Sequence, residues 1–236
     1  MLSLRAVNQY YGQNHTLWDL SLELPRGQCT LLLGRNGVGK TTLVNCIMGH
    51  LPIVSGSMIW QPIDEPPQNL LQQPVENRAL LGIGYVPQGR QIFSQLSVEE
   101  NLQVALLAGK DKTRRIPPII YHLFPHLQAM RWRRAGDLCE GEQQQLAISR
   151  ALVLEPELLI LDEPTAGIPP SLVTELGHVI HKLNRELGMT ILLVEHKLPF
   201  ARQLADRFCL MDKGRNVADG LLEELDETLI KAYLAV

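Results

Sequence analysis

The chain of 236 residues has few cysteines, no long apolar run and little net charge. Its four cysteines lie far apart without paired spacing, which argues against a disulfide framework or a zinc site and fits a reducing compartment. No apolar run approaches the roughly 18 residues of a membrane span, and the first residues do not open a signal peptide. We therefore expect a cytoplasmic protein that reaches a membrane only through another chain.

The charge balance and the composition exclude further classes of protein. With a net charge of −3, the chain does not have the basic character of a general nucleic-acid binder. Apolar residues make up 45% and charged residues 20%, which excludes disordered, collagen-like and coiled-coil proteins. We expect one globular domain spanning residues 1–236.

Short apolar runs alternate with longer helical patterns, which predicts an α/β fold with a mostly parallel sheet. The runs at 30–33, 158–161 and 190–194 are continuously apolar, as in strands buried on both faces. Residues 1–30 predict a small antiparallel β subdomain. Residues from about 90 to 155 have a mostly helical pattern, which predicts a helical subdomain inserted into the α/β core.

Three local patterns give narrower expectations. Residues 61–79 are rich in proline and glutamine and predict a surface loop. Ser97 and Glu100 have the spacing of a capping box at the start of a helix. Leu221, Leu225 and Leu229 predict one face of a C-terminal helix packed on the core.

The strongest signal is a glycine-rich segment that satisfies G-x-x-x-x-G-K-[ST] between a strand and a helical pattern. Its glycines let successive backbone amides point at one anion, and the following helix adds its positive end. A glycine turn with a chance lysine is the alternative, which this context disfavours. Lys40 supplies charge for the β- and γ-phosphates and the Thr41 hydroxyl is placed to bind Mg²⁺. The expected phosphate-binding residues are Gly34, Arg35, Asn36, Gly37, Val38, Gly39, Lys40, Thr41 and Thr42.

Polar residues follow two other buried strands, where an α/β sheet presents its ligands. Asp162 is expected to hold Mg²⁺, and Glu163 to orient or deprotonate an attacking water. The alternative is a helix-capping aspartate beside a surface glutamate. His196 is a candidate contact to the γ-phosphate, or else a structural histidine.

These pieces in this order resemble the nucleotide-binding subunit of ABC transporters over essentially the whole chain. Residues 85–88 resemble the family's Q-loop, which implies that Gln88 binds Mg²⁺ and senses the permease. The resemblance also implies that Glu163 is the catalytic glutamate and His196 the switch histidine. Tyr11 matches the aromatic residue that stacks on adenine, with Tyr10 as a near competitor.

The resemblance implies a P-loop NTPase core with the two subdomains described above. It implies ATP and Mg²⁺ as cofactors, with Thr41, Gln88 and Asp162 as metal ligands, and ATP hydrolysis that energises transport through separate permease subunits. The chain would lie at the inner face of the plasma membrane, with a solute-binding protein as an indirect partner. The sequences of its motifs are most similar to those of the branched-chain amino-acid importer group, and within that group to those of the urea-type branch. A phosphotransferase or GTPase would leave these further motifs unexplained, and no guanine-reading Asn-Lys-x-Asp is present.

One motif, which in the ABC transporter family is called the signature, departs from the family pattern. Where members usually read Leu-Ser-Gly-Gly-Gln and bind the γ-phosphate held by the opposite subunit, this chain has Cys139, Glu140, Gly141 and Glu142 after Leu138. A thiol is a weaker donor than a hydroxyl, and two carboxylates at a helix N-terminus would repel phosphate. The alternative is that they point to solvent as ordinary residues of a helix N-terminus.

The altered motif predicts a heterodimer with a related ATP-binding subunit. Its two nucleotide sites would differ in activity, and the site that uses this chain's altered motif would be the weaker one. The alternative is a regulatory subunit that binds nucleotide and hydrolyses it weakly.

Overall fold

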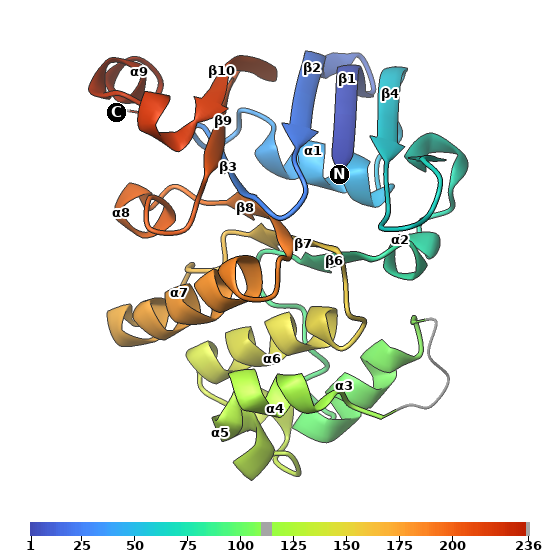
Figure 1. Ribbon diagram of the computed structural model, residues 1–236, viewed down its shortest axis with the longest axis vertical. Coiled ribbons are helices and arrows are strands. Elements are labelled where there is room, and N and C mark those ends of the chain that lie inside the picture. The colour runs from blue at the N-terminus through green and yellow to red at the C-terminus, as the bar shows by residue number, and fades with distance from the viewer. Residues whose placement is uncertain (110–114, 235–236) are drawn as a thin grey trace.

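The computed structural model describes residues 1–109 and 115–234, and all statements about the fold refer to them. In this part of the chain a six-stranded sheet has the order β10-β9-β3-β8-β7-β6 (Figure 1). Its strands are β3 (Cys29–Leu33), β6 (Ile83–Val86), β7 (Leu158–Asp162), β8 (Thr190–Val194), β9 (Arg207–Asp212) and β10 (Arg215–Leu221). All pairs are parallel except β10 with β9, so the expected mostly parallel sheet is confirmed.

The N-terminal strands form a second sheet of order β2-β1-β4-β5 within the described residues. Its strands are β1 (Leu2–Tyr11), β2 (Asn14–Leu24), β4 (Ser55–Trp60) and β5 (Gln68–Asn69). β1 pairs antiparallel with both β2 and β4. The antiparallel β subdomain expected from residues 1–30 is therefore present, and it also includes β4 and β5.

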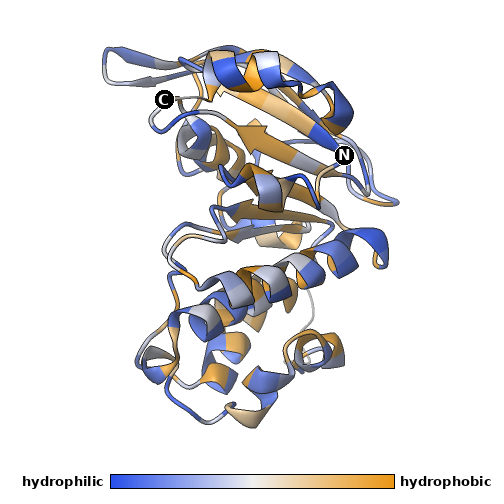
Figure 2. Cartoon of the chain, turned by 90° about the vertical axis from the view of Figure 1, so that its left-hand side faces the viewer, coloured by the Kyte–Doolittle hydropathy of each residue, from blue (hydrophilic) through white to orange (hydrophobic). Residues whose placement is uncertain are grey.

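The central sheet separates two hydrophobic cores, which explains its continuously apolar strands. In β7, Leu158 and Ile160 belong to the core shared with α1 (Lys40–Met48) and the antiparallel sheet. Leu159 and Leu161 belong to the other core, on the helical side. Because successive side chains of a strand point to opposite faces, both faces need apolar residues. Figure 2 shows the resulting apolar interior strands.

In the described residues between β6 and β7, four α-helices pack together at the end of the molecule opposite the antiparallel sheet (Figure 1). They are α3 (Val98–Leu106), α4 (Pro118–Leu123), α5 (Pro125–Ala129) and α6 (Glu140–Leu152). α3 begins with the predicted capping box: Glu100 N donates to Ser97 Oγ, and Ser97 N donates to Glu100 Oε2 at 2.7 Å. The expected helical insertion in the α/β core is thus observed.

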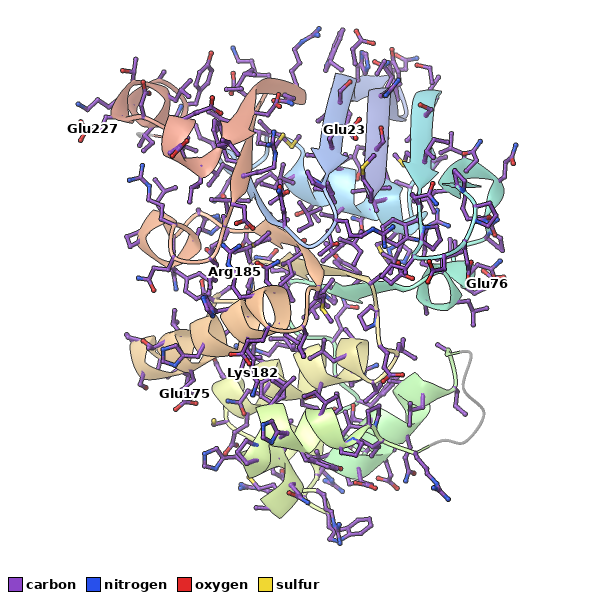
Figure 3. All side chains as sticks on the ribbon, viewed as in Figure 1. Glu23, Glu76, Glu175, Lys182, Arg185 and Glu227 are labelled. Atoms are coloured by element: carbon purple, nitrogen blue, oxygen red, sulfur yellow. The ribbon has the colours of Figure 1, made fainter. Side chains whose placement is uncertain are left out.

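The remaining helices cover the edges and the helical side of the central sheet. They are α2 (Asn77–Leu80), α7 (Pro170–Arg185), α8 (Leu198–Ala201) and α9 (Glu227–Tyr233), with short 3₁₀ turns at Leu70–Gln72, Ala135–Asp137 and Leu222–Glu224. α7 is amphipathic, since Leu176 and Ile180 are buried while Glu175 is exposed and Lys182 half-buried (Figure 3).

One local prediction was right only in part and another was wrong. Residues 61–67 and 73–76 are irregular and mostly exposed, as expected of a surface loop, but the segment 61–79 also contains β5, a 3₁₀ turn and most of α2. The buried Arg78 orders this segment, because its guanidinium donates to the Ile47 and Leu70 carbonyls at 2.8 and 3.0 Å. The leucine stripe does not lie on one helix: Leu221 ends β10, Leu225 follows a 3₁₀ turn, and only Leu229 is in α9.

Candidate active site

The glycine-rich segment forms the turn between β3 and α1. Gly34, Gly37 and Gly39 have φ values of +147°, +80° and +107°. A Cβ at Gly34 would come within 2.5 Å of the Met211 carbonyl oxygen, so only glycine fits there. α1 starts without a side-chain cap and without an acidic residue in its first turn. Its first amides and its positive end are therefore available to an anion.

Lys40 is folded into this turn. Its Nζ donates to the carbonyl oxygens of Gly34 and Arg35 at 2.7 and 2.9 Å, and the residue is 6% exposed. Burial lowers the pKa of Lys40, while the nearby carboxylates of Glu163 and Asp162 act in the opposite direction. An ammonium has three N–H donors, so two bonds to the loop leave one for a phosphate.

A cavity of about 320 Å³ opens onto the turn. Its lining comes from the turn and α1 and from the segments that follow β6, β7 and β8. Because β3, β8, β7 and β6 are neighbours in the parallel sheet, their carboxyl ends converge at this edge. The lining residues are Asn36, Gly37, Gly39, Lys40, Thr41, Thr42, Gln88, Glu163 and His196. Residues predicted from separate motifs thus face one cavity.

Glu163 occupies the centre of this group. Its Oε2 accepts a hydrogen bond of 2.8 Å from Nε2 of Gln88. Its Oε1 lies 3.6 Å from Nδ1 of His196, which is an ion pair only when the imidazole is protonated. Glu163 has the left-handed φ of +50°, and its amide donates to the Val194 carbonyl oxygen. The carboxylate is therefore held toward the cavity, where it can accept a proton from water.

Asp162 is suited to hold a cation. The residue is 2% exposed, and both of its carboxylate oxygens are buried without a well-formed hydrogen bond in the described part of the chain. Burial, together with the neighbouring Glu163 carboxylate, raises the pKa of Asp162 to about 6, although the Thr41 hydroxyl beside the Asp162 carboxylate acts in the opposite direction. A buried carboxylate without a well-formed hydrogen bond is stabilised by a cation, and Mg²⁺ binds through one or two carboxylates plus substrate phosphates. Thr41 and Gln88 line the adjacent cavity and complete a fitting donor set.

Sequence reasoning missed Glu195, which directly follows β8. This residue is 1% exposed, and its Oε2 accepts a hydrogen bond of 2.6 Å from the Thr165 hydroxyl. Its Oε1 accepts hydrogen bonds from the amides of His196 and Lys197 at 2.9 and 3.0 Å. Glu195 thereby holds the backbone of His196 to the loop after β7. Its position directly after a buried apolar strand was the available sequence signal.

Replacing Glu195 with alanine is expected to lower the free energy of unfolding by about 2–4 kcal/mol, because the Thr165 hydroxyl and two amides lose a charged acceptor. Urea denaturation followed by circular dichroism measures this change. Glu186, exposed after α7, is the matched control, and Glu186→Ala should stay within about 0.5 kcal/mol of the wild type. Equal midpoints for the two variants would contradict this role of Glu195.

The two candidate adenine-stacking residues lie at the end of β1, outside the lining of the cavity. The ring of Tyr10 is stacked on His15 at 4.0 Å between centroids, and His15 in turn lies 3.6 Å from Trp18. One face of Tyr10 is therefore covered. Tyr11 is 48% exposed, which favours Tyr11 for stacking on a base.

The altered motif starts α6 and does not line the cavity. Cys139 is exposed at the N-cap, and its amide donates to Oε2 of Glu142 at 2.8 Å. Glu142 therefore acts as an ordinary residue of a helix N-terminus, whereas Glu140 pairs with Arg90 at 3.0 Å. A Cβ on Gly141 would overlap the Leu172 side chain, so α6 and α7 pack closely at this glycine.

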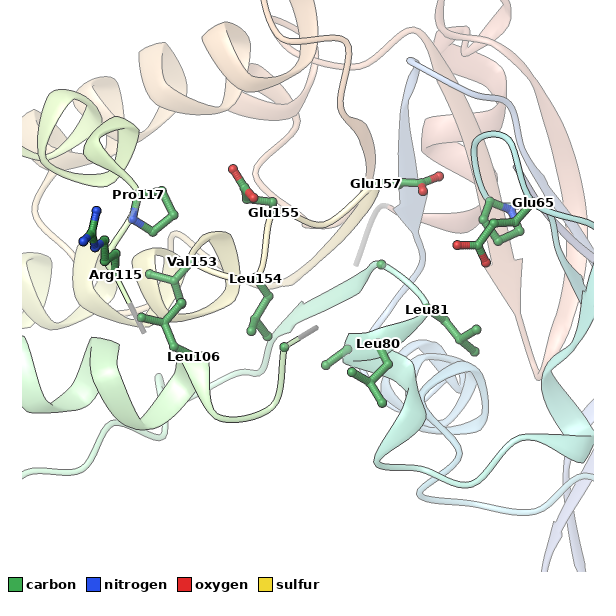
Figure 4. A pocket seen from close by; sticks show the side chains of 14 residues that line it. Glu65, Leu80, Leu81, Leu106, Arg115, Pro117, Val153, Leu154, Glu155 and Glu157 are labelled. Atoms are coloured by element: carbon green, nitrogen blue, oxygen red, sulfur yellow. The ribbon is translucent and has the colours of Figure 1, made fainter. Parts of the chain in front are cut away.

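A separate cavity of about 250 Å³ lies away from the phosphate loop (Figure 4). Among the described residues that line it, Glu65, Glu155 and Glu157 contribute carboxylates and Arg115 a guanidinium, and Arg26 lies 3.6 Å from Glu157. The described lining of this cavity contains no residue of the phosphate loop. No cluster of three or more His, Cys, Asp or Glu side chains suited to a metal occurs in the described residues.

Comparisons with known proteins agree with the geometry of the first cavity. Residues 17–166 match the model of the ABC transporter family. The chain is 38% identical over 218 residues to the high-affinity branched-chain amino acid transport ATP-binding protein BraG of Pseudomonas aeruginosa, covering 92% of this chain and 91% of that protein. It is 35% identical to the probable branched-chain amino acid transport ATP-binding protein LivF of Archaeoglobus fulgidus, covering 96% and 94%.

A solved structure of an ATP-binding subunit of an ABC transporter superposes with a TM-score of 0.82 at 27% identity, covering 97% of this chain and 93% of that one. Within the described residues, no helix combines the length and apolar character needed to cross a bilayer. This chain belongs to the ABC transporter family and is an ATP-binding, ATP-hydrolysing subunit of that family.

Proposed function

We propose that this subunit energises uptake of a small polar solute through separate permease subunits. The main support for this proposal is that the phosphate loop, Gln88, Glu163 and His196 line the same cavity. Similarity to two branched-chain amino acid transport proteins favours branched-chain amino acids or their amides as solutes. Urea is a further candidate, because the motif sequences resemble those of the urea-type branch. Uptake of radiolabelled leucine and urea by cells with and without the gene separates these solutes, and unchanged uptake of both would contradict the proposal.

The chain's own residues define how hydrolysis would proceed. The loop amides and Lys40 bind and neutralise the β- and γ-phosphates. Mg²⁺, held by Thr41, Asp162 and Gln88, would offset charge on the phosphate oxygens. Glu163 orients a water in line with the γ-phosphate and accepts its proton, while His196 approaches the terminal phosphate from the end of β8.

We also propose that residues 1–236 act as one nucleotide-binding domain within a larger assembly. Its partners would be the permease subunits, a related ATP-binding subunit and, indirectly, a solute-binding protein. The permease would hold the chain at the inner face of the plasma membrane. Copurification of tagged full-length protein from solubilised membranes tests this assembly, and recovery of the chain without any permease would argue against it.

The two nucleotide sites of the proposed heterodimer are expected to differ. The phosphate loop, Gln88, Glu163 and His196 of this chain have the arrangement of a working site, whereas its signature carries Cys139 and Glu140 in place of serine and glycine. The site that uses this signature is therefore the weaker one. If Glu163→Gln leaves turnover unchanged while the equivalent change in the partner abolishes it, the assignment of the working site is wrong.

A regulatory subunit with weak hydrolysis is the second candidate, and the altered signature is the observation that favours it. The bonded Gln88–Glu163 pair beside His196 favours hydrolysis instead. Steady-state ATP turnover of the complex with its copurified partner discriminates between the two functions.

A further inference from the structure

Arg90 and Glu140 form an ion pair between the Gln88 segment and the start of α6. Nη2 of Arg90 lies 3.0 Å from Oε2 of Glu140, across a sequence separation of 50 residues. The same nitrogen lies 3.5 Å from the carbonyl oxygen of Ala166, in the loop after β7. The Arg90 side chain is 18% exposed and the Glu140 side chain 61%. The arginine is thus the anchored partner, and the glutamate is the side chain that it holds.

The backbone around Arg90 is constrained to present this side chain. Gly89, Arg90 and Gln91 have φ values of +80°, +67° and +47°, and the left-handed region is unfavourable for residues that carry a Cβ. Arg150, in the last turn of α6, donates to the Gln91 carbonyl oxygen at 2.6 Å, and its guanidinium lies over the ring of Phe93. α6 is therefore tied to this segment near both of its ends.

The pair is seated against Gly167, in the same loop after β7. A Cβ at Gly167 would lie 3.1 Å from both Nη2 of Arg90 and Oε2 of Glu140. The absent side chain leaves room for the two charged groups to meet. The Glu140 carboxylate is thereby drawn from the first turn of α6 toward the loop after β7.

The charge of Glu140 affects phosphate binding because Glu140 is the first residue of α6. A carboxylate there neutralises the positive end of the helix and repels a phosphate that approaches the same amides. The neighbouring Glu142 carboxylate is already engaged by the Cys139 amide. Glu140 is therefore the signature carboxylate that pairs with a cation from another segment.

We propose that Arg90 is a positioning residue for the nucleotide held by the partner subunit. It turns the Glu140 carboxylate away from the signature amides and neutralises it, so that these amides can receive the γ-phosphate despite the altered motif. This inference rests on the proposed function, because it requires that two subunits enclose the nucleotide between them.

A double-mutant cycle on the complete transporter assembly, with Mg-ATP as the probe, tests this role. Arg90→Ala is expected to raise KM for ATP by about fivefold or more while Glu140 is present, because the released carboxylate faces the phosphate. In the Glu140→Gly background the same change should raise KM less than about twofold. Arg90→Lys retains the charge and should restore most of the affinity. Arg185→Ala, which removes a different surface ion pair with Asp206, is the matched control.

Two results would overturn the inference: an unchanged KM in Arg90→Ala, or an equal rise in both backgrounds, which would mean that Arg90 only shapes its loop. Calorimetry of Mg-ATP binding to each isolated chain provides a separate check. Because the signature acts on the nucleotide held by the partner subunit, all isolated variants should bind Mg-ATP with the same Kd as the isolated wild-type chain. Weaker binding by isolated Arg90→Ala would also overturn the inference. The proposed function itself would be wrong if the isolated wild-type chain did not bind Mg-ATP or if the assembly did not hydrolyse it. The inference would then fall with the proposed function.

Discussion

Glu163→Gln is expected to reduce ATP turnover about a thousandfold while Mg-ATP stays bound, as the loss of a general base typically costs 10²–10⁴ in rate. The amide cannot accept the proton of the attacking water, although it retains the size of the carboxylate beside Gln88 and His196. Binding should persist because the phosphate loop and Lys40 are untouched, and the unhydrolysed nucleotide should hold the two proposed ATP-binding subunits together around it. Phosphate release measures turnover, and size-exclusion chromatography with Mg-ATP measures the trapped complex.

The matched control for this prediction is Glu175→Gln, at an exposed position of α7 (Figure 3). It makes the same chemical change far from the cavity and should leave turnover within about twofold of the wild type. A Glu163→Gln complex that turns over ATP at the native rate would remove Glu163 from its proposed role.

Lys40→Ala is expected to weaken Mg-ATP binding by about a hundredfold, since a charge-assisted hydrogen bond to phosphate contributes roughly 3 kcal/mol. The variant loses the ammonium that Gly34 and Arg35 hold inside the phosphate loop. Isothermal titration calorimetry on the full-length chain measures the change in Kd. Circular dichroism should show native secondary structure, because the loop glycines that set the backbone remain.

Lys182→Ala on α7 (Figure 3) is the control for loss of a lysine charge away from the cavity. Its Kd for Mg-ATP should equal that of the wild type. Equal affinities of Lys40→Ala and the wild type would show that the nucleotide does not use this loop.

The phosphate loop could be predicted from sequence because its conformation is local. Gly34, Gly37 and Gly39 supply the left-handed positions within nine consecutive residues, and an apolar strand leads directly into α1. Asp162 and Glu163 were predicted for a similar reason, since a buried strand ends at the edge where α/β sheets present their ligands. The capping box at Ser97 is equally short in range.

Predictions that depended on distant packing were less successful. Residues 61–79 were expected to form a loop because proline and glutamine weaken local periodicity, yet Arg78 orders them through carbonyls of other segments. The leucine stripe from 221 to 229 suggested one helix, but the chain uses Leu221 at the end of β10. Both errors arose where tertiary contacts override a local pattern.

Short-range patterns thus establish the class of fold, the phosphate loop and the two carboxylates, because neighbouring residues dictate the backbone there. The convergence of Gln88, Glu163 and His196 on one cavity depends on the order of the strands, which no local pattern contains. The pairing of Glu140 with Arg90 and the buried role of Glu195 depend equally on packing between distant segments. Charges far apart in the chain acquire partners only when the folded core brings them within hydrogen-bonding distance.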